Sequence, residues 1–217
     1  MTKQQPTVKQ EQESIVSLLT GTKKYVHDHK KRVIVGAVIL VLAVVFGYAY
    51  SSHVNKVREN SWAAYYNAQL AVMNDPSALT QLDGVALQYP GTQAAQYAQL
   101  LKGDILYAQE NFAQAADVYQ PLLNAQNETL RTVATLSLAA ARQATKDYDG
   151  SIKLMKDFIQ NNPKSFALPQ AYFTLALSQE LAGKKDEAVE TYKQILADYT
   201  KTYFGAVAKD KLAVLTK

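Results

Sequence analysis

Small residues recur through most of this chain at an almost constant spacing. The recurring positions lie 37, 36 and 37 residues apart, and they hold Ala78, Ala115, Ser151 and Ala188. Four positions later in each copy comes a bulky apolar or aromatic residue, in the order Leu82, Tyr119, Met155 and Tyr192. A period of roughly 20 to 50 residues is typical of proteins whose units stack on their neighbours. The repeat therefore predicts a chain built from stacked structural units, and it is the strongest indication of the fold.

The amino-acid composition favours helices for these repeats. The 217 residues include only 9 Gly and 6 Pro, 48% of them are apolar, and Ala, Leu and Gln are abundant. This usage favours helices over strands. The chain has no Cys, which excludes a disulfide scaffold, a cysteine-ligated metal site and a thiol nucleophile. We therefore predict an all-α chain.

The repeat resembles the tetratricopeptide repeat (TPR), a helix–turn–helix motif of about 34 residues, with two or three extra residues between copies. If the recurring small residues take position 20, position 4, typically Trp, is Trp62 in the first copy and Tyr172 in the fourth. Position 32, typically Pro, is Pro90 and Pro163 in copies one and three. The resemblance implies a TPR-like α-solenoid of about four helix pairs. Its repeats are expected at approximately 59–92, 96–129, 132–165 and 169–202, with a capping helix at 203–216.

The residue types at these positions agree with the resemblance on physical grounds. Small residues at positions 8 and 20 let the two helices of a repeat approach closely, and Pro at position 32 ends the second helix. Two copies depart from the pattern, because Tyr65-Tyr66 is bulky where small residues are usual and Lys102 replaces a large apolar residue. Asp75-Pro76 is a candidate N-cap and first helical residue for the second helix of the first repeat.

Residues 33–50 form an apolar run of eighteen residues with no charge, Asn, Gln or Pro. In a helix this run rises roughly 27 Å, which is close to the roughly 30 Å hydrocarbon core of a bilayer. We therefore predict a transmembrane helix at 33–50. Because no Gly or Pro occurs from 48 to 75, we expect the helix to continue unbroken into the repeats.

The charges that flank this run predict its orientation. The ten residues before it, 23–32, carry five Lys or Arg, whereas only Lys56 and Arg58 follow before Lys102. The positive-inside rule then places a polar and basic tail, 1–32, in the cytoplasm and the domain 51–217 across the membrane. A cleaved signal peptide is the alternative, since residues 47–49 loosely resemble a cleavage site. The long lead-in and the length of the apolar run favour an uncleaved anchor.

The basic charge of the chain is confined to its beginning. Residues 1–58 hold nine Lys or Arg against three acids, a net +6, and residues 59–217 hold fourteen against sixteen, a net −2. A nucleic-acid surface would need a basic stripe on the folded body. We therefore expect no nucleic-acid partner.

No motif in the chain predicts catalysis or metal binding. The sequence has no nucleotide-binding loop and no Gly-x-Ser-x-Gly. His27 and His29 flank Asp28, but side chains two apart on a helix point in different directions and cannot chelate one ion together. We predict a non-enzymatic chain with no cofactor and no metal site.

In TPR proteins the partner usually binds a concave face, formed largely by positions 2, 5, 9 and 12 of the first helix of each repeat. Those positions carry no Lys or Arg here, so the charged clamp that grips a C-terminal carboxylate in some TPR proteins is absent. For Leu136 and Leu177, burial beneath neighbouring repeats is an open alternative. The candidate protein-binding residues are Leu70, Tyr97, Leu100, Tyr107, Leu136, Phe173 and Leu177.

The whole layout resembles one bacterial family. A polar tail, a basic lead-in and one apolar helix precede Trp62-Ala-Ala-Tyr-Tyr-Asn-Ala, which opens the four TPR-like copies. This is similar to the YfgM-type family, the ancillary subunit of the SecYEG translocon. The resemblance implies a single-pass protein of the bacterial cell inner membrane, with a cytoplasmic N-terminus and a periplasmic TPR domain.

The same resemblance implies a function in protein export. The expected partners are the SecYEG translocon and a membrane-anchored periplasmic chaperone, and the expected role is to assist handover of exported proteins to that chaperone. A TPR scaffold for envelope or outer-membrane assembly or for cell division is the alternative. An enzyme is a third reading that only an unrecognised site would support.

Overall fold

The computed structural model describes residues 20, 22–23, 25–75 and 77–216, which form helices and turns and include no strand. Most of the predicted tail, 1–32, lies outside the described residues. The chain divides into two compact units, Met1–Lys56 and Val57–Lys217. In chain order the helices are α2 (Lys30–Asn74), α3 (Thr80–Gln88), α4 (Gln93–Ala108), α5 (Phe112–Tyr119), the 3-10 helix η1 (Gln120–Asn124), α6 (Glu128–Ala144), α7 (Tyr148–Asn161), α8 (Leu168–Leu181), α9 (Lys185–Tyr199) and α10 (Tyr203–Leu215).

Helix α2 is 45 residues long. It contains the apolar run 33–50 and continues past it without interruption to Asn74. The prediction of an unbroken helix from the run into the repeats is therefore confirmed. Within the described part of the chain, α2 is the one helix long and apolar enough to cross a membrane. Its apolar side chains between 33 and 50 are exposed around the whole helix, whereas a core helix would bury at least a stripe of them. Helix α2 is therefore a candidate membrane span.

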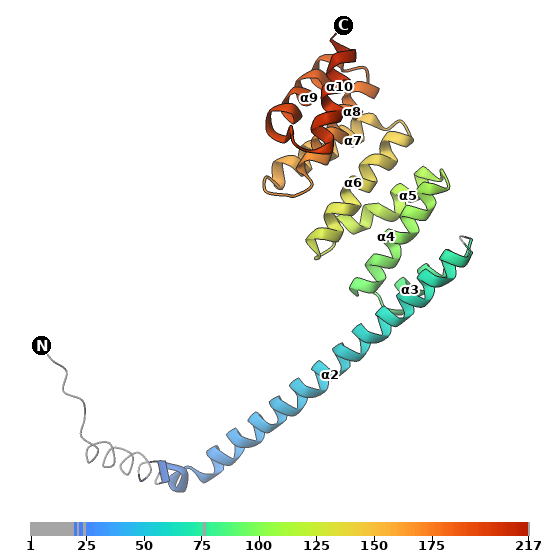
Figure 1. Cartoon of the computed structure of the whole chain (residues 1–217). Coiled ribbons are helices and arrows are strands. Elements are labelled where there is room, and N and C mark those ends of the chain that lie inside the picture. The colour runs from blue at the N-terminus through green and yellow to red at the C-terminus, as the bar shows by residue number, and fades with distance from the viewer. Residues whose placement is uncertain (1–19, 21, 24, 76, 217) are drawn as a thin grey trace, which may run out of the picture. The chain divides into compact units, whose positions relative to one another are not determined.

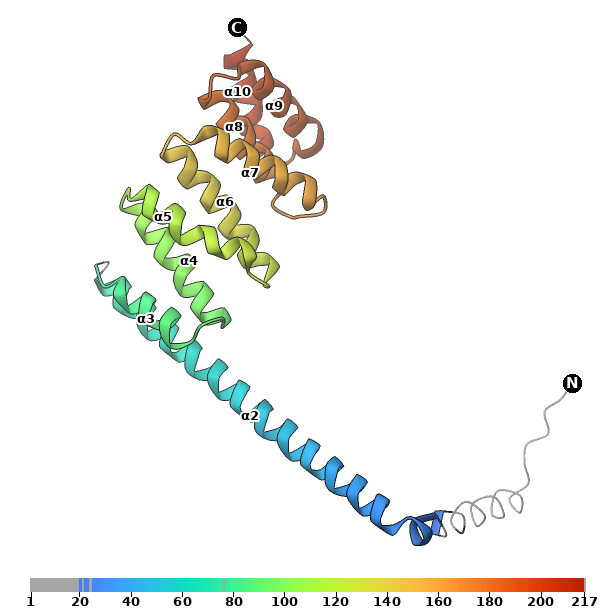
Figure 2. The same cartoon turned by 180° about the vertical axis from the view of Figure 1, so that it is seen from behind.

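The unit Val57–Lys217 is an α-solenoid of the predicted TPR-like kind. Consecutive helices from α3 to α10 pack side by side, and α4 also contacts α6, α6 contacts α8, and α8 contacts α10. We call the end of α2 (59–74), α4, α6, α8 and α10 the A helices, and α3, α5, α7 and α9 the B helices. Figure 1 shows the pairs following one another along the unit in chain order, and Figure 2 shows the same succession from behind.

The small residues at position 20 lie where the helices of a repeat touch. Ala115, Ser151 and Ala188 are completely buried. At position 8 of the second copy, Gly103 is also buried, and a Cβ there would collide with the ring of Tyr119. Small residues therefore permit the close packing that the repeat pattern predicts.

The first copy departs from this pattern, as its bulky residues predict. Ala78 at position 20 is only partly buried, and Tyr66 at position 8 is exposed. The core of this copy instead joins the end of α2 to α3 and α4. Its buried members are Ala68, Val72, Leu82, Val85 and Ala98.

The turns that follow α4, α6 and α8 repeat the same backbone conformation. Glu110, Lys146 and Gly183 have φ of 63°, 65° and 75° and lie 36 and 37 residues apart. The next residue donates its N–H to the carbonyl five residues back, as in the bond from Asp147 to Arg142 of 2.8 Å. This is the Schellman motif, which satisfies the last carbonyls of a helix.

Most A helices begin at a polar cap. Thr92, Asn127 and Thr202 accept hydrogen bonds from the backbone N–H three residues later, at 3.2, 3.0 and 3.1 Å. Each cap satisfies one of the unpaired donors at a helix start.

The predicted cap at Asp75 is wrong. Helix α3 begins at Thr80, and the Asp75 Oδ1 atom instead accepts from the N–H and hydroxyl of Ser77, at 2.9 and 2.7 Å. Asp75 therefore stabilises a turn ahead of α3, because its nearest donors belong to that turn and not to the helix.

Candidate functional site

The structure separates the seven predicted binding residues by exposure. Leu70 is 59% exposed, and Tyr97, Tyr107, Phe173 and Leu177 are partly buried. Leu100 and Leu136 are both buried. Leu100 and Leu136 therefore lie inside the solenoid and not on an exposed face, which for Leu136 is the alternative that the sequence left open.

Their burial has one physical cause. Leu100 and Leu136 occupy position 5 of their A helices, and the next A helix covers that position. Leu100 lies in a core cluster with Leu130 and Leu138 of α6, and Leu136 lies in one with Leu175 of α8. The repeat pattern identifies the face of a helix, but the superhelical stacking decides which part of that face stays open.

An aromatic cluster lies at the beginning of the solenoid. The Trp62 ring centroid is 5.6 Å from those of Tyr65 and Tyr97 and 6.0 Å from that of Tyr66. Burial raises the pKa of Tyr65, and the neighbouring Tyr66, Tyr97 and Asp104 raise it further. Tyr66 is 56% exposed although it was not among the predicted binding residues. This cluster therefore presents aromatic surface to solvent.

The other end of the predicted face is largely covered by the chain itself. The Phe173 ring packs at 5.6 Å from Phe204 of α10 and at 6.1 Å from Tyr192 of α9. The capping helix therefore occupies the surface beside Phe173. The accessible part of the predicted face includes Leu70, Tyr97 and Tyr107 in the first two repeats, and Leu177 of α8 is partly exposed as well.

An open pocket of about 210 Å³ lies between α4 and α6 on this accessible part. The Tyr119 hydroxyl donates to the Asp104 Oδ1 atom at 2.6 Å. Asp104 is exposed to solvent, but partial desolvation by its neighbours raises the pKa of its carboxyl, and the bond from Tyr119 partly opposes that rise. No Lys or Arg of the described residues forms an ion pair with Asp104. The pocket lining is Asp104, Tyr107, Tyr119, Ser137 and Ala140.

A similar carboxylate in the fourth repeat does have a cation. The Tyr192 hydroxyl donates to the Glu180 Oε2 atom at 2.9 Å. The Lys211 Nζ atom of α10 donates to both oxygens of the same carboxylate, at 3.0 and 3.1 Å. Tyr192, Glu180 and Lys211 therefore form a side-chain triad that links α8, α9 and α10.

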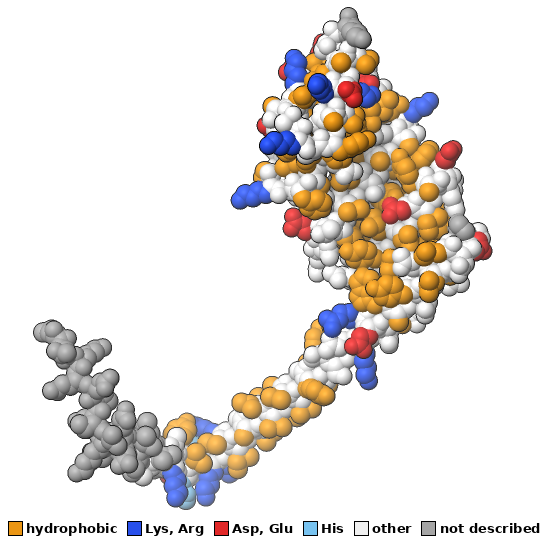
Figure 3. Space-filling view, in the orientation of Figure 1, with side chains coloured by type: hydrophobic (Ala, Val, Ile, Leu, Met, Phe, Trp, Pro, Cys, Tyr) orange, Lys and Arg blue, Asp and Glu red, His pale blue; other side chains and the backbone are white. Residues whose placement is uncertain are grey.

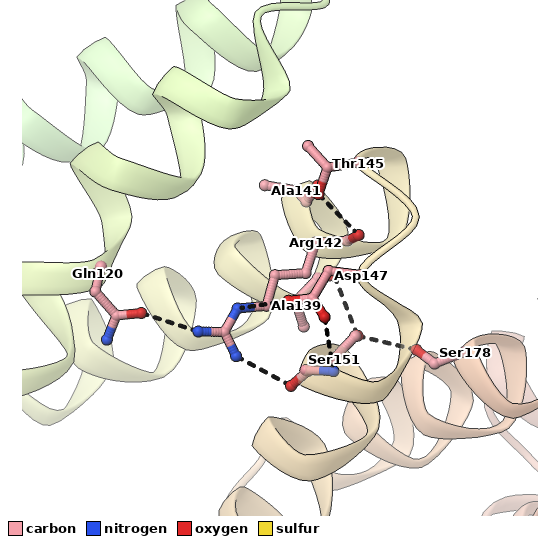
Figure 4. Close-up of polar contacts among 9 residues, drawn as sticks. Gln120, Ala139, Ala141, Arg142, Thr145, Asp147, Ser151 and Ser178 are labelled. Carbon is pink, nitrogen blue, oxygen red and sulfur yellow. Dashed lines mark hydrogen bonds and ion pairs between the residues drawn. The ribbon is translucent and has the colours of Figure 1, made fainter. Parts of the chain in front are cut away.

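A network of polar contacts joins the second, third and fourth repeats, and sequence reasoning did not identify it. The Arg142 guanidinium donates to the Gln120 side chain and to the Gly150 carbonyl, each at 3.0 Å. The Ser151 and Ser178 hydroxyls lie 2.9 Å apart, and both are completely buried. Figure 4 shows these contacts crossing between helices. The Ser178 hydroxyl also donates to the Thr174 carbonyl of its own helix at 2.7 Å, but the other contacts join different elements and therefore stabilise the stacking of repeats.

A comparison with known families agrees with this architecture. The profile of the tetratricopeptide repeat-like domain family matches residues 23–217. The chain belongs to this family. The match covers α2 and every later helix of the structure.

One curated relative and two solved structures extend the comparison. The small glutamine-rich tetratricopeptide repeat-containing protein 2 of Saccharomyces cerevisiae is 30% identical over 100 residues, which are 44% of this chain and 28% of that protein. The chain therefore matches less than a third of the length of this relative. Two crystal structures of nearly identical TPR-like repeats from a Podosopora anserina putative kinesin light chain have TM-scores of 0.53 and 0.54 at 19% and 18% identity. Each covers 76% of this chain and 85% of its own, which shows the shared fold.

Proposed function

We propose that the chain is a membrane-anchored, non-enzymatic scaffold that binds protein segments on the accessible part of its A-helix face. TPR-like domains generally bind other proteins, and the yeast relative is a TPR protein as well. The observation that carries the proposal is the exposed apolar and aromatic surface of the first two repeats. Leu70, Tyr66, Tyr97 and Tyr107 supply the rigid apolar contacts that dominate protein interfaces.

The location and the partners follow from the family resemblance of the sequence. The five bases before the apolar run favour a cytoplasmic N-terminus, which would put the solenoid in the periplasm of a bacterial cell. There it would meet chains leaving the SecYEG translocon and pass them to a membrane-anchored chaperone. An exposed apolar face close to the site of translocation would suit unfolded segments, because these expose apolar residues.

Site-specific photo-crosslinking in intact membranes tests this proposal. A photoreactive residue at position 70 of the full chain should capture SecY or a periplasmic chaperone. The matched control carries the same residue at position 117, because Asp117 is exposed on the B helix α5. Capture should be strong at position 70 and weak at position 117.

The identity of the captured protein separates the two scaffold functions. Recovery of SecY or a chaperone supports a role in export. Recovery of outer-membrane assembly or cell-division proteins would favour the alternative scaffold. Equal capture from positions 70 and 117 would contradict binding on the A-helix face.

A further inference from the structure

Two tyrosines in equivalent positions hold a carboxylate on their own A helix. Tyr119 and Tyr192 are at position 24 of the second and fourth copies, and both are almost completely buried. Their hydroxyls donate to Asp104 and Glu180 at 2.6 and 2.9 Å. Asp104 is at position 9 of its copy and Glu180 is at position 12, so the two equivalent tyrosine hydroxyls bind carboxylates from neighbouring turns of their A helices.

The two pairs differ in what lies on the next A helix. Ser137 on α6, Thr174 on α8 and Lys211 on α10 follow one another at a spacing of 37 residues, so they occupy equivalent positions. Lys211 reaches the carboxylate of the fourth repeat. Ser137 carries no charge, so it cannot pair with Asp104. The open pocket lies between these two side chains and is lined by both.

We infer that the pocket at Asp104 receives the side chain of a lysine from a bound partner segment, in the way that the carboxylate of Glu180 receives Lys211. This inference rests on the protein-binding function proposed above and names the chemistry of its partner. The occupant is a lysine within an otherwise apolar segment. Its ammonium would bind Asp104, and its methylene stem would lie against the ring of Tyr107.

The geometry favours lysine over arginine. The cation that the chain itself places on its other tyrosine-bound carboxylate is a lysine, Lys211 on Glu180, and a compact ammonium needs only one free acceptor site on Asp104. Tyr107 lines the same pocket, and an aromatic face attracts a cation that lies over it. A lysine also keeps its stem against apolar surface while its charge is satisfied.

The surroundings of the pocket suit an apolar segment on both sides of that lysine. Figure 3 shows hydrophobic side chains gathered over the part of the solenoid where α4 and α6 lie in Figure 1, with an acidic group among them. Asp104 is exposed to solvent and forms no ion pair with a described Lys or Arg, and partial desolvation raises the pKa of its carboxyl, so no cation of the described residues compensates its charge. A partner lysine would supply that compensation.

Zero-length crosslinking of the full chain in intact membranes tests the inference. A carbodiimide joins a carboxylate to an amine only when the two are in contact. We expect mass spectrometry to find Asp104 joined to a lysine of another polypeptide. The internal positive control is the bond between Glu180 and Lys211, whose atoms lie 3.0 Å apart.

Three variants make the test specific. Asp104→Asn keeps an oxygen for Tyr119 but removes the charge, so it should abolish that crosslink. Because a hydrogen bond to a charged group is lost, it should also lower capture from position 70 about tenfold. Asp117→Asn, an exposed aspartate on α5, should change neither. Ser137→Lys places a lysine where α10 has Lys211, and should replace the intermolecular crosslink by one between Asp104 and residue 137 within the chain.

The outcomes distinguish failure of this inference from failure of the proposed function. If position 70 captures its partner equally well from Asp104→Asn, and Asp104 forms no crosslink while Glu180 and Lys211 do, the lysine pocket is wrong and the binding face stands. If position 70 captures nothing specific, the binding face is wrong and the pocket is overturned with it.

Discussion

Glu110, Lys146 and Gly183 adopt the same left-handed conformation at the end of their A helices, yet only one of them is glycine. A residue with a Cβ is less stable in this conformation by about 1–2 kcal/mol. The Schellman hydrogen bonds of each turn hold the residue there regardless. The two non-glycine positions therefore store backbone strain that the stacked repeats offset.

We predict that Lys146→Gly stabilises the solenoid. It should raise the free energy of unfolding by about 1 kcal/mol, because glycine adopts positive φ without a steric penalty. The measurement is urea unfolding of the compact unit Val57–Lys217. The control Lys153→Gly, at an exposed site inside α7, should instead destabilise by about 1 kcal/mol. Equal losses in both variants would show that the turn carries no strain.

A second prediction at the residue scale concerns pH. Because the pKa of Asp104 is raised in the folded chain, the folded state binds the proton more tightly than the unfolded state. The stability gained from that proton is present below the ordinary Asp pKa of about 3.9 and is lost as the pH rises through the raised pKa. Asp104→Asn should therefore be more stable than the natural chain at pH 7. This difference should disappear below about pH 4 in thermal unfolding, and a difference that persists there would contradict it.

At the scale of the elements, the close packing of neighbouring helices depends on the small residues at their contacts. Ala115 is completely buried, in the core cluster that joins α4, α5 and α6, whereas Ala113 of the same helix is exposed. Ala115→Leu should lower the free energy of unfolding by about 1–3 kcal/mol, because a tight core cannot accept extra methylene groups without strain. Ala113→Leu is the matched control and should leave urea midpoints almost unchanged. If the two variants behave alike, the assignment of position 20 is wrong.

The sequence pattern identifies helices better than it identifies their exposed faces. The 37-residue spacing predicts a solenoid because each repeat contacts only its neighbours, so local pattern and tertiary contact coincide. Leu100 and Leu136 show the limit, since their exposure depends on the helix of the next repeat. The bond between Tyr119 and Asp104 shows it again, because fifteen residues separate two polar groups that meet only once the helices stack.

At the scale of the whole molecule, the basic residues just before the apolar run of α2 determine the expected orientation in the membrane. Residues 23–32 carry five Lys or Arg, and the run that follows exposes apolar side chains on all sides. We predict a single pass with the N-terminus in the cytoplasm. Protease added to spheroplasts should digest the solenoid and spare residues 1–32. Activity of a C-terminal reporter that works only in the cytoplasm would contradict this orientation.

The single tryptophan of the chain lies among the tyrosines of the first repeat. Trp62 is partly buried, and three tyrosine rings lie within 6.0 Å of it. Light absorbed by those tyrosines will pass to the indole, and the colour of its emission will follow the polarity of its surroundings. The chain therefore carries its own fluorophore at the edge of the proposed binding face. A segment that settles beside Tyr97 should shift that emission without any added label.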